Sequence, residues 1–306
     1  MKSRGTRAGL TRREILTVGG LSVATVAVGH GLTGCGREPT GPAHDGHVQT
    51  LRYGSDASQF VELTLPESAT GPVPVAVVIH GGFWRSAYGL ELGRPLAGTL
   101  PGQGWAALNI EYRRVGNGGG YPATLIDVAL AIDLLADAGQ AAARDSDLEL
   151  DLETVVTIGH SAGGHLAAWA ATRTGQDAGS PGAAPRVGVS AVVSQAGVLD
   201  LRACAREGLG DGAAQAFLAG GPDDVPDRYE QASPIEWLPL GVPTLCVHAS
   251  QDANVPISQS EDFVAAALAA GDDAELVTVE GDHFVVIDPE HPSWSLVLDW
   301  LDRVVG

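Results

Sequence analysis

The chain has 306 residues, 44% of them hydrophobic, which suffices for one large domain with a buried core. Its formal charge is −19, from 18 Lys plus Arg against 37 Asp plus Glu. A protein with this much negative charge repels phosphate backbones and anionic lipid head groups. The composition therefore argues against nucleic acid as a partner.

The beginning of the chain is typical of an export signal. Arg12 and Arg13 stand before a weakly apolar stretch, residues 15–32, that is rich in Gly, Ala, Ser and Thr. This is the layout of a twin-arginine signal. The stretch is followed directly by a segment that resembles the bacterial lipobox, in which cleavage before Cys35 leaves its thiol to carry lipid.

Two alternatives stay open for this segment: a plain signal peptide in which Cys35 is incidental, and an uncleaved anchor, for which Gly19, Gly20 and His30 are poorly suited. We predict a signal peptide over residues 1–34, a flexible tether over 35–47 and one folded domain over 48–306. The protein is then exported and lipid-anchored, with Cys35 holding it to the outer face of the bacterial cytoplasmic membrane.

From residue 48 on, short apolar and β-branched runs alternate with segments of helical period. A strand, a helix and a further strand in succession give a mostly parallel sheet with helices on both faces, so the fold class is α/β. Strands are predicted at 51–53, 60–65, 73–79, 106–110, 154–158, 187–193, 244–247 and 276–279. Helices are predicted at 90–100, 122–138, 162–172, 257–270 and 293–304.

Two features interrupt this regular order. Residues 198–239 are rich in Gly and Asp, and we predict a substrate-facing segment there, a candidate partial lid. Cys204 and Cys246 are chemically able to pair in an exported protein. Cys246, however, lies in an apolar run, as is typical of a small buried hydrophobe, so we favour two free thiols.

The sequence Gly-His-Ser-Ala-Gly at 159–163 fits the G-x-S-x-G pattern. It follows a predicted strand and precedes a predicted helix, as a nucleophile elbow requires. Such a turn holds its serine in a strained conformation that lifts the hydroxyl out of the sheet. Ser161 is therefore the predicted nucleophile.

A serine hydroxyl needs a histidine to take its proton. In the chain order Ser, acid, His, the base must follow Ser161. His283 lies in a glycine-containing loop after the last predicted strand, the position expected of the base. The alternatives are weaker, since His165 lies one turn along the same helix, His248 ends a buried strand and His291 leads into a helix.

The acid that orients the histidine is predicted to be Asp252. It follows a buried strand and precedes Pro256, which can open the next helix, so it lies at the carboxyl edge of the sheet with Ser161. Asp200, after the preceding strand, is the main rival. Asp282 adjoins the histidine in sequence and is poorly placed to orient it.

Backbone N–H groups are expected to hold the developing oxyanion. One comes from Ala162, directly after the nucleophile. The others are assigned to the glycine turn after the strand 73–79, formed by Gly81, Gly82 and Phe83. Trp84, next in the chain, is predicted to line the substrate pocket.

The chain resembles esterase/lipase α/β-hydrolases near the kynurenine formamidase and hormone-sensitive-lipase-like groups. The resemblance rests on HGGFW at residues 80–84 and GHSAG at 159–163, and it spans about residues 73–300. It implies an α/β-hydrolase fold and scaffold roles for His80, Tyr112, Arg113 and Asp127. Predicted export departs from the formamidase group, whose members act in intracellular tryptophan breakdown.

These features predict a serine hydrolase that cleaves small-molecule carboxylic esters through an acyl-enzyme, without a cofactor. No histidine spacing matches a metal site. Two aromatic rings at Phe83 and Trp84 favour short acyl chains, and the alternative is that one or both rings point into the core and say nothing about substrate. The alternatives are an aryl-formamidase or other amidase and, from a different class, a surface lipoprotein without activity.

Overall fold

The computed structural model describes residues 48–305. The predicted signal peptide, Cys35 and the tether lie outside the described residues. None of the described helices is long and apolar enough to cross a membrane.

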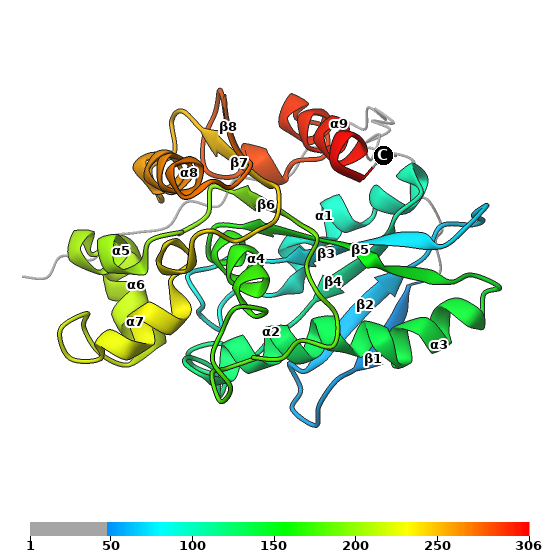
Figure 1. Cartoon of the computed structure of the whole chain (residues 1–306), viewed down its shortest axis with the longest axis horizontal. Helices are drawn as coiled ribbons and strands as arrows, with labels where there is room; N and C mark the ends of the chain where they lie inside the picture. The colour runs from blue at the N-terminus through cyan, green and yellow to red at the C-terminus, as the bar shows by residue number, and fades with distance from the viewer. Residues whose placement is uncertain (1–47, 306) are drawn as a thin grey trace, which may run out of the picture. The chain divides into compact units, whose positions relative to one another are not determined.

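One eight-stranded sheet organises the described domain (Figure 1). Its order is β1-β2-β4-β3-β5-β6-β7-β8; β2 pairs antiparallel with both its neighbours, and every later pair is parallel. The strands are β1 (Gln49–Arg52), β2 (Phe60–Thr64), β3 (Val73–Ile79), β4 (Ala106–Ile110), β5 (Leu150–His160), β6 (Ala191–Gln195), β7 (Thr244–Ala249) and β8 (Ala274–Val279). This is the predicted α/β-hydrolase fold, and it places β5 in the interior of the sheet.

Strand side chains alternate between two hydrophobic clusters, one on each face of the sheet. In β3, Val75 and Val77 belong to one cluster, whereas Ala76 and Val78 belong to the other. The first face is covered by α2 (Ala123–Asp133), α3 (Ala138–Arg144), α4 (Ala162–Thr172) and α8 (Ser258–Ala270). The second is covered by α1 (Arg94–Ala97) and α9 (Pro292–Val305) (Figure 1).

Several predicted boundaries were wrong. The strand predicted at 187–193 is β6, at Ala191–Gln195. The helix predicted at 90–100 consists of three short pieces, η1 (Leu90–Leu92), α1 and η2 (Leu100–Gln103), separated by Gly93 and Gly98–Thr99. The helix predicted at 122–138 is interrupted by η3 (Leu134–Ala136), a tighter 3₁₀ turn, and restarts as α3.

Residues 198–239 are mainly helical. They form α5 (Leu201–Glu207), α6 (Leu209–Leu218), α7 (Pro226–Ala232) and η4 (Pro234–Trp237), and Figure 1 shows α5, α6 and α7 grouped together beyond α4. Within the bounds of α6, Gly210, Asp211 and Gly212 form a left-handed turn, with positive φ values between 53° and 74°. Phe217 and Tyr229 are fully buried, which ties the segment to the core.

Candidate active site

Ser161 lies in a strained turn between β5 and α4. Its φ of 56° and ψ of −120° are far from helix or strand values, and its own N–H donates to the Gln195 carbonyl at 2.8 Å. A Cβ added at Gly159 would lie 2.0 Å from the Gly163 carbonyl oxygen, and one added at Gly163 would lie 2.0 Å from the Ile79 oxygen. Both elbow glycines are therefore required by close packing of the backbone.

Asp252 and His283 are brought together from the loops after β7 and β8. The Oδ2 of Asp252 accepts a hydrogen bond from His283 Nδ1 at 2.6 Å. Its Oδ1 accepts the backbone N–H groups of Asn254 and Val255 at 2.8 and 2.9 Å. Burial alone raises the pKa of Asp252, but hydrogen bonds from His248 and His283 outweigh it and hold the pKa well below its usual range.

This hydrogen bond sets the tautomer of His283. An ionised carboxylate only accepts, so the ring proton lies on Nδ1 and leaves Nε2 with a lone pair. In residues 48–305 no hydrogen bond joins the Ser161 hydroxyl to His283. Such contacts are often long in the absence of substrate.

A second histidine, His248, contacts the same carboxylate and was not predicted to do so. Its Nε2 lies 3.4 Å from Asp252 Oδ2 and donates to the Val255 carbonyl at 3.0 Å. Its Nδ1 accepts from the Ser260 hydroxyl at 2.8 Å. His248 ends β7, four residues before Asp252, and that spacing was the only sequence signal of the contact.

The glycine turn after β3 lies against the nucleophile. A Cβ added at Gly81 would stand 3.0 Å from Ser161 Cβ, and Gly82 and Phe83 have φ of 111° and 50°. Within the described domain, the N–H groups of Gly82 and Phe83 donate to no protein acceptor. Ala162 opens α4, where its N–H has no partner within the helix.

A buried polar network holds this turn from behind. His80 Nδ1 donates to the Gly81 carbonyl at 2.8 Å, and the Tyr112 hydroxyl donates to the His80 carbonyl at 2.7 Å. The Glu111 carboxylate contacts His80 Nε2 at 3.2 Å and also pairs with Arg114. The peptide planes leading into the glycine turn are thereby fixed.

Of the other residues given scaffold roles, Arg113 and Asp127 form an ion pair of 2.7 Å in which the carboxylate is fully buried. Asp127 also accepts the Arg113 backbone N–H at 3.0 Å. The pair ties the segment after β4 to α2.

Trp84 does not present a surface to substrate. It is fully buried, stacks on Phe217 with ring centroids 4.8 Å apart, and donates Nε1–H to His165 Nδ1 at 3.2 Å. The prediction that it lines the pocket was wrong, because the ring packs in the core against Phe217 and His165. Phe83 is half-buried, and its ring lies where a Cβ at Gly210 would meet it at 2.6 Å.

The residues weighed as alternatives for the acid and the base make structural contacts instead. Asp200 is the N-cap of α5, where its side chain accepts the Ala203 N–H at 2.9 Å. His165 is fully buried in contact with Trp84, and burial lowers its pKa to about 4. His291 contacts Ser293 at the start of α9. Asp282 accepts the backbone N–H of Phe284.

Cys204 and Cys246 are both free and buried. Burial raises the pKa of each thiol to about 12, so neither is a thiolate at neutral pH. In residues 48–305 no cluster of three or more His, Cys, Asp or Glu side chains could hold a metal ion.

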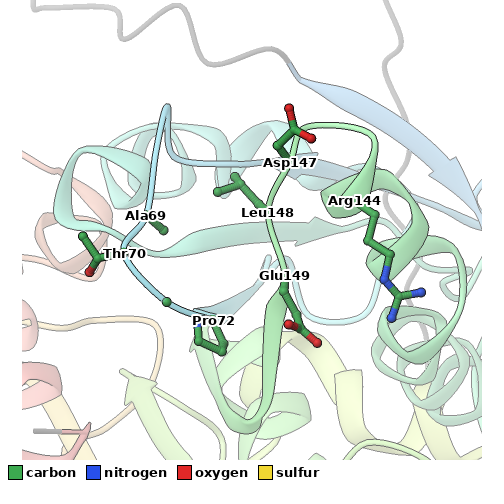
Figure 2. Close-up of a pocket in the computed structure, with 8 residues that line it drawn as sticks. Ala69, Thr70, Pro72, Arg144, Asp147, Leu148 and Glu149 are labelled. Atoms are coloured by element: carbon green, nitrogen blue, oxygen red, sulfur yellow. The ribbon is translucent and has the colours of Figure 1, made fainter.

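A surface hollow of about 470 Å³ lies at the end of the sheet opposite to Ser161 (Figure 2). It is lined by the loop before β3 and the loop before β5, at the amino ends of parallel strands, whereas Ser161 follows the carboxyl end of β5. Figure 2 shows Arg144, Asp147 and Glu149 pointing in different directions rather than converging. The hollow therefore has no focused set of polar groups.

A nucleophile elbow at the carboxyl end of the interior strand β5, with an acid from the loop after β7 and a histidine from the loop after β8, defines a chain of the α/β-hydrolase class. The BD-FAE family profile matches residues 61–267, more than half of the chain. The chain belongs to the BD-FAE family.

Curated relatives and solved structures agree with this class. The chain is 27% identical to Esterase LipC of Mycobacterium tuberculosis over 71% of its own length and 54% of LipC. It is 29% identical to Esterase LipQ of the same organism, over 67% of its own length and 48% of LipQ. The chain thus spans about half the length of the curated relatives it matches.

Among solved structures, a truncated carbohydrate esterase from gut microbiota superposes with a TM-score of 0.71 at 22% identity, covering 86% of this chain and 99% of that one. Butyrate-bound esterase Est2 of Thermogutta terrifontis superposes with a TM-score of 0.65 at 22% identity, covering 84% and 93%. At this identity the likeness concerns the fold.

Proposed function

We propose that this protein is a serine hydrolase that cleaves carboxylic esters. The observation that carries the proposal is the 2.6 Å hydrogen bond between Asp252 and His283 at the sheet edge where the strained Ser161 emerges. The names of two relatives, Esterase LipC and Esterase LipQ, support the same chemistry.

In the proposed reaction, Ser161 Oγ attacks the ester carbonyl carbon while His283 Nε2 takes the hydroxyl proton. The carbonyl electron pair moves onto oxygen, and the N–H groups of Gly82, Phe83 and Ala162 stabilise that oxyanion. The intermediate collapses, the alkoxide leaves with the proton from His283, and Ser161 carries the acyl group. Water then repeats the sequence, which releases the acid and restores the serine.

Asp252 supports both halves of this cycle. Its low pKa keeps it ionised while His283 is protonated, so it stabilises the imidazolium and holds the ring in one tautomer. Because the carboxylate accepts four hydrogen-bond or ion-pair contacts, from His283, His248, Asn254 and Val255, it has little freedom to rotate away from the base.

We also propose that the acyl chains are short. Support comes from Phe83, which is half-buried beside the oxyanion turn with its ring against Gly210, and from Arg85, whose guanidinium donates to the Gly210 carbonyl. These contacts place the start of α6 beside the turn and limit space there. The aryl-formamidase alternative uses the same groups, and it would require preference for N-formylkynurenine over acetyl esters.

A fluorophosphonate probe tests the proposal directly. The wild-type protein is expected to be labelled, Ser161→Ala to lose labelling and ester turnover, and Ser250→Ala to keep both. Ser250 is an exposed serine in the loop that leads to Asp252, so it is a matched control. Labelling that survives in Ser161→Ala would overturn the assignment. A panel of acetyl to octanoyl p-nitrophenyl esters then measures the acyl preference.

Export and lipid anchoring at Cys35 remain part of the proposal. Their support is the paired arginines and the lipobox-like segment. Cys35→Ala is expected to stop lipid labelling in cells and release the protein from membranes. An exported wild-type protein that is soluble without modification would contradict the anchor.

A further inference from the structure

His160, the residue in the variable position of the elbow motif, contacts the proposed base. Its Nε2 lies 2.9 Å from the backbone carbonyl of His283, and the two imidazole centroids are 4.4 Å apart with planes tilted by 48°. The ring is buried. The residue directly before the nucleophile therefore touches both the main chain and the ring of the histidine that is to accept the nucleophile's proton.

The hydrogen bond defines the tautomer of His160. A carbonyl oxygen only accepts, so the proton lies on Nε2. Nδ1 is buried and has no partner among residues 48–305. A second proton on the ring would find no acceptor there, and burial lowers the pKa of His160 to about 3. His160 is therefore neutral at working pH and keeps one fixed donor.

His160 also contacts the oxyanion turn. A Cβ added at Gly81 would lie 3.1 Å from His160 Nδ1 and 2.7 Å from the His160 carbonyl oxygen. His160 and Gly81 are both among the residues that line a small cavity of about 10 Å³. The imidazole thus stands between the turn that holds the oxyanion donors and the loop that carries His283.

We propose that His160 is a positioning residue that fixes His283 relative to Ser161 through its Nε2–H bond to the His283 carbonyl. The inference deepens the proposed hydrolase function and rests on it. Asp252 holds the ring of His283 at Nδ1, but the loop of His283 follows the edge strand β8 and passes through Gly281, whose φ is 123°. The bond from His160 ties this loop to the end of the interior strand β5.

Three substitutions of His160 distinguish the effect of its Nε2–H donor from the effect of its aromatic ring. His160→Phe keeps an aromatic ring without the donor, and His160→Asn removes both the ring and the reach of the donor. His160→Gln places an amide N–H near the position of Nε2 and so tests rescue. We expect His160→Phe and His160→Asn to lower kcat by about 10–100-fold, as small displacements of catalytic groups do, with KM within about twofold. His160→Gln is expected to recover most of the loss.

A second measurement does not depend on turnover. The proton of His283 Nδ1 in its short bond to Asp252 is expected to give a low-field NMR resonance, assigned by its loss in Asp252→Asn. His160→Phe and His160→Asn should broaden or shift this resonance because the loop is no longer fixed, and His160→Gln should restore it. Thermal melting checks that each variant is folded.

The outcomes distinguish the two levels of the proposal. A resonance that follows the donor supports the positioning role even in a protein that hydrolyses no ester, in which case only the hydrolase proposal fails. Folded His160→Phe and His160→Asn proteins with wild-type kcat and an unchanged resonance would overturn it. So would a His160→Gln protein that is folded yet as impaired as the other two in both measurements.

Discussion

His283 and Asp252 stand 31 residues apart in the chain and are joined by a 2.6 Å hydrogen bond between Nδ1 and Oδ2. The parallel pairing of β7 with β8 brings this about, because both loops leave the sheet at the same edge. The carboxylate is almost entirely buried, with 1% of its side-chain surface exposed. Because so little water screens it, the negative charge of Asp252 interacts strongly with the imidazole of His283.

Replacing Asp252 with Asn tests this pairing. The amide is neutral, and its NH₂ would favour the wrong tautomer of His283, so we expect turnover to fall by roughly 10⁴. Asp200→Asn is the matched control: asparagine caps a helix as well as aspartate does, so α5 and the activity should both be retained. The opposite ranking in a p-nitrophenyl acetate assay would assign the acid to Asp200.

The elbow packing predicts a sharp difference between two glycines. Gly163→Ala would force a methyl group to within 2.0 Å of the Ile79 carbonyl oxygen, which belongs to the backbone and cannot rotate away. We expect a loss of more than about 3 kcal/mol of stability, or an insoluble protein. Gly175→Ala meets only the Thr172 oxygen at 3.7 Å and should melt as the wild type does. Equal melting of the two variants would contradict the close approach.

Trp84→Phe tests the core assignment of Trp84. It removes the donor to His165 Nδ1 and should cost about 1–2 kcal/mol of stability in urea unfolding, because a buried acceptor is left unpaired. The ratio of kcat/KM for acetyl and octanoyl esters should not change. Phe83→Ala, by contrast, should shift that ratio toward the longer chain. A shift caused by Trp84→Phe would place its ring in the site after all.

His165 gives the fold a specific sensitivity to acid. Its pKa falls from 6.5 to about 4 in the folded protein, chiefly through burial, so the unfolded chain binds a proton first as the pH drops. Stability linked to His165 is therefore present near neutral pH and is lost as the pH falls from about 6.5 to 4.

His165→Gln removes this contribution and can still donate toward the Ala232 carbonyl. Between pH 7 and 4.5 we expect the wild type to lose about 2–3 kcal/mol more stability than the variant does. His160 titrates in both proteins and cancels from the comparison. Parallel curves of unfolding free energy against pH would show that His165 is not buried in its neutral form.

Features set by local sequence were predictable here. The turn at Ser161 was predictable from five consecutive letters between a strand and a helix, and the loop positions of Asp252 and His283 from their order after it. His160 was missed because its slot in the motif accepts any residue, and only tertiary contact with the loop after β8 gives it a partner. The burial of Trp84 could not be settled from the sequence because it depends on contacts with Phe217 and His165, which are distant in the chain.

The helices of residues 198–239 were missed for a different reason. Each is short, and the left-handed turn through Gly210 and Asp211 places glycine and aspartate inside what is otherwise helical sequence. Isolated helices of that length are not stable in water, so packing of Phe217 and Tyr229 decides their formation. Composition alone therefore indicated a loop.

The proposed catalytic groups follow strands that differ in burial and in the number of paired neighbours. The last six residues of β5 are buried on both faces, and the Ser161 N–H is bonded to Gln195 on the neighbouring strand, so that amide exchanges with solvent only when the middle of the sheet opens. His283 follows β8, a partly exposed edge strand with a neighbour on one side only. We therefore expect the loop that carries His283 to become mobile at a lower temperature than the turn that carries Ser161. If the proposed activity holds, we expect heat inactivation to precede the loss of secondary structure, and cooling to restore turnover as long as the interior strands have stayed paired; activity and circular dichroism recorded on the same heating ramp would check this.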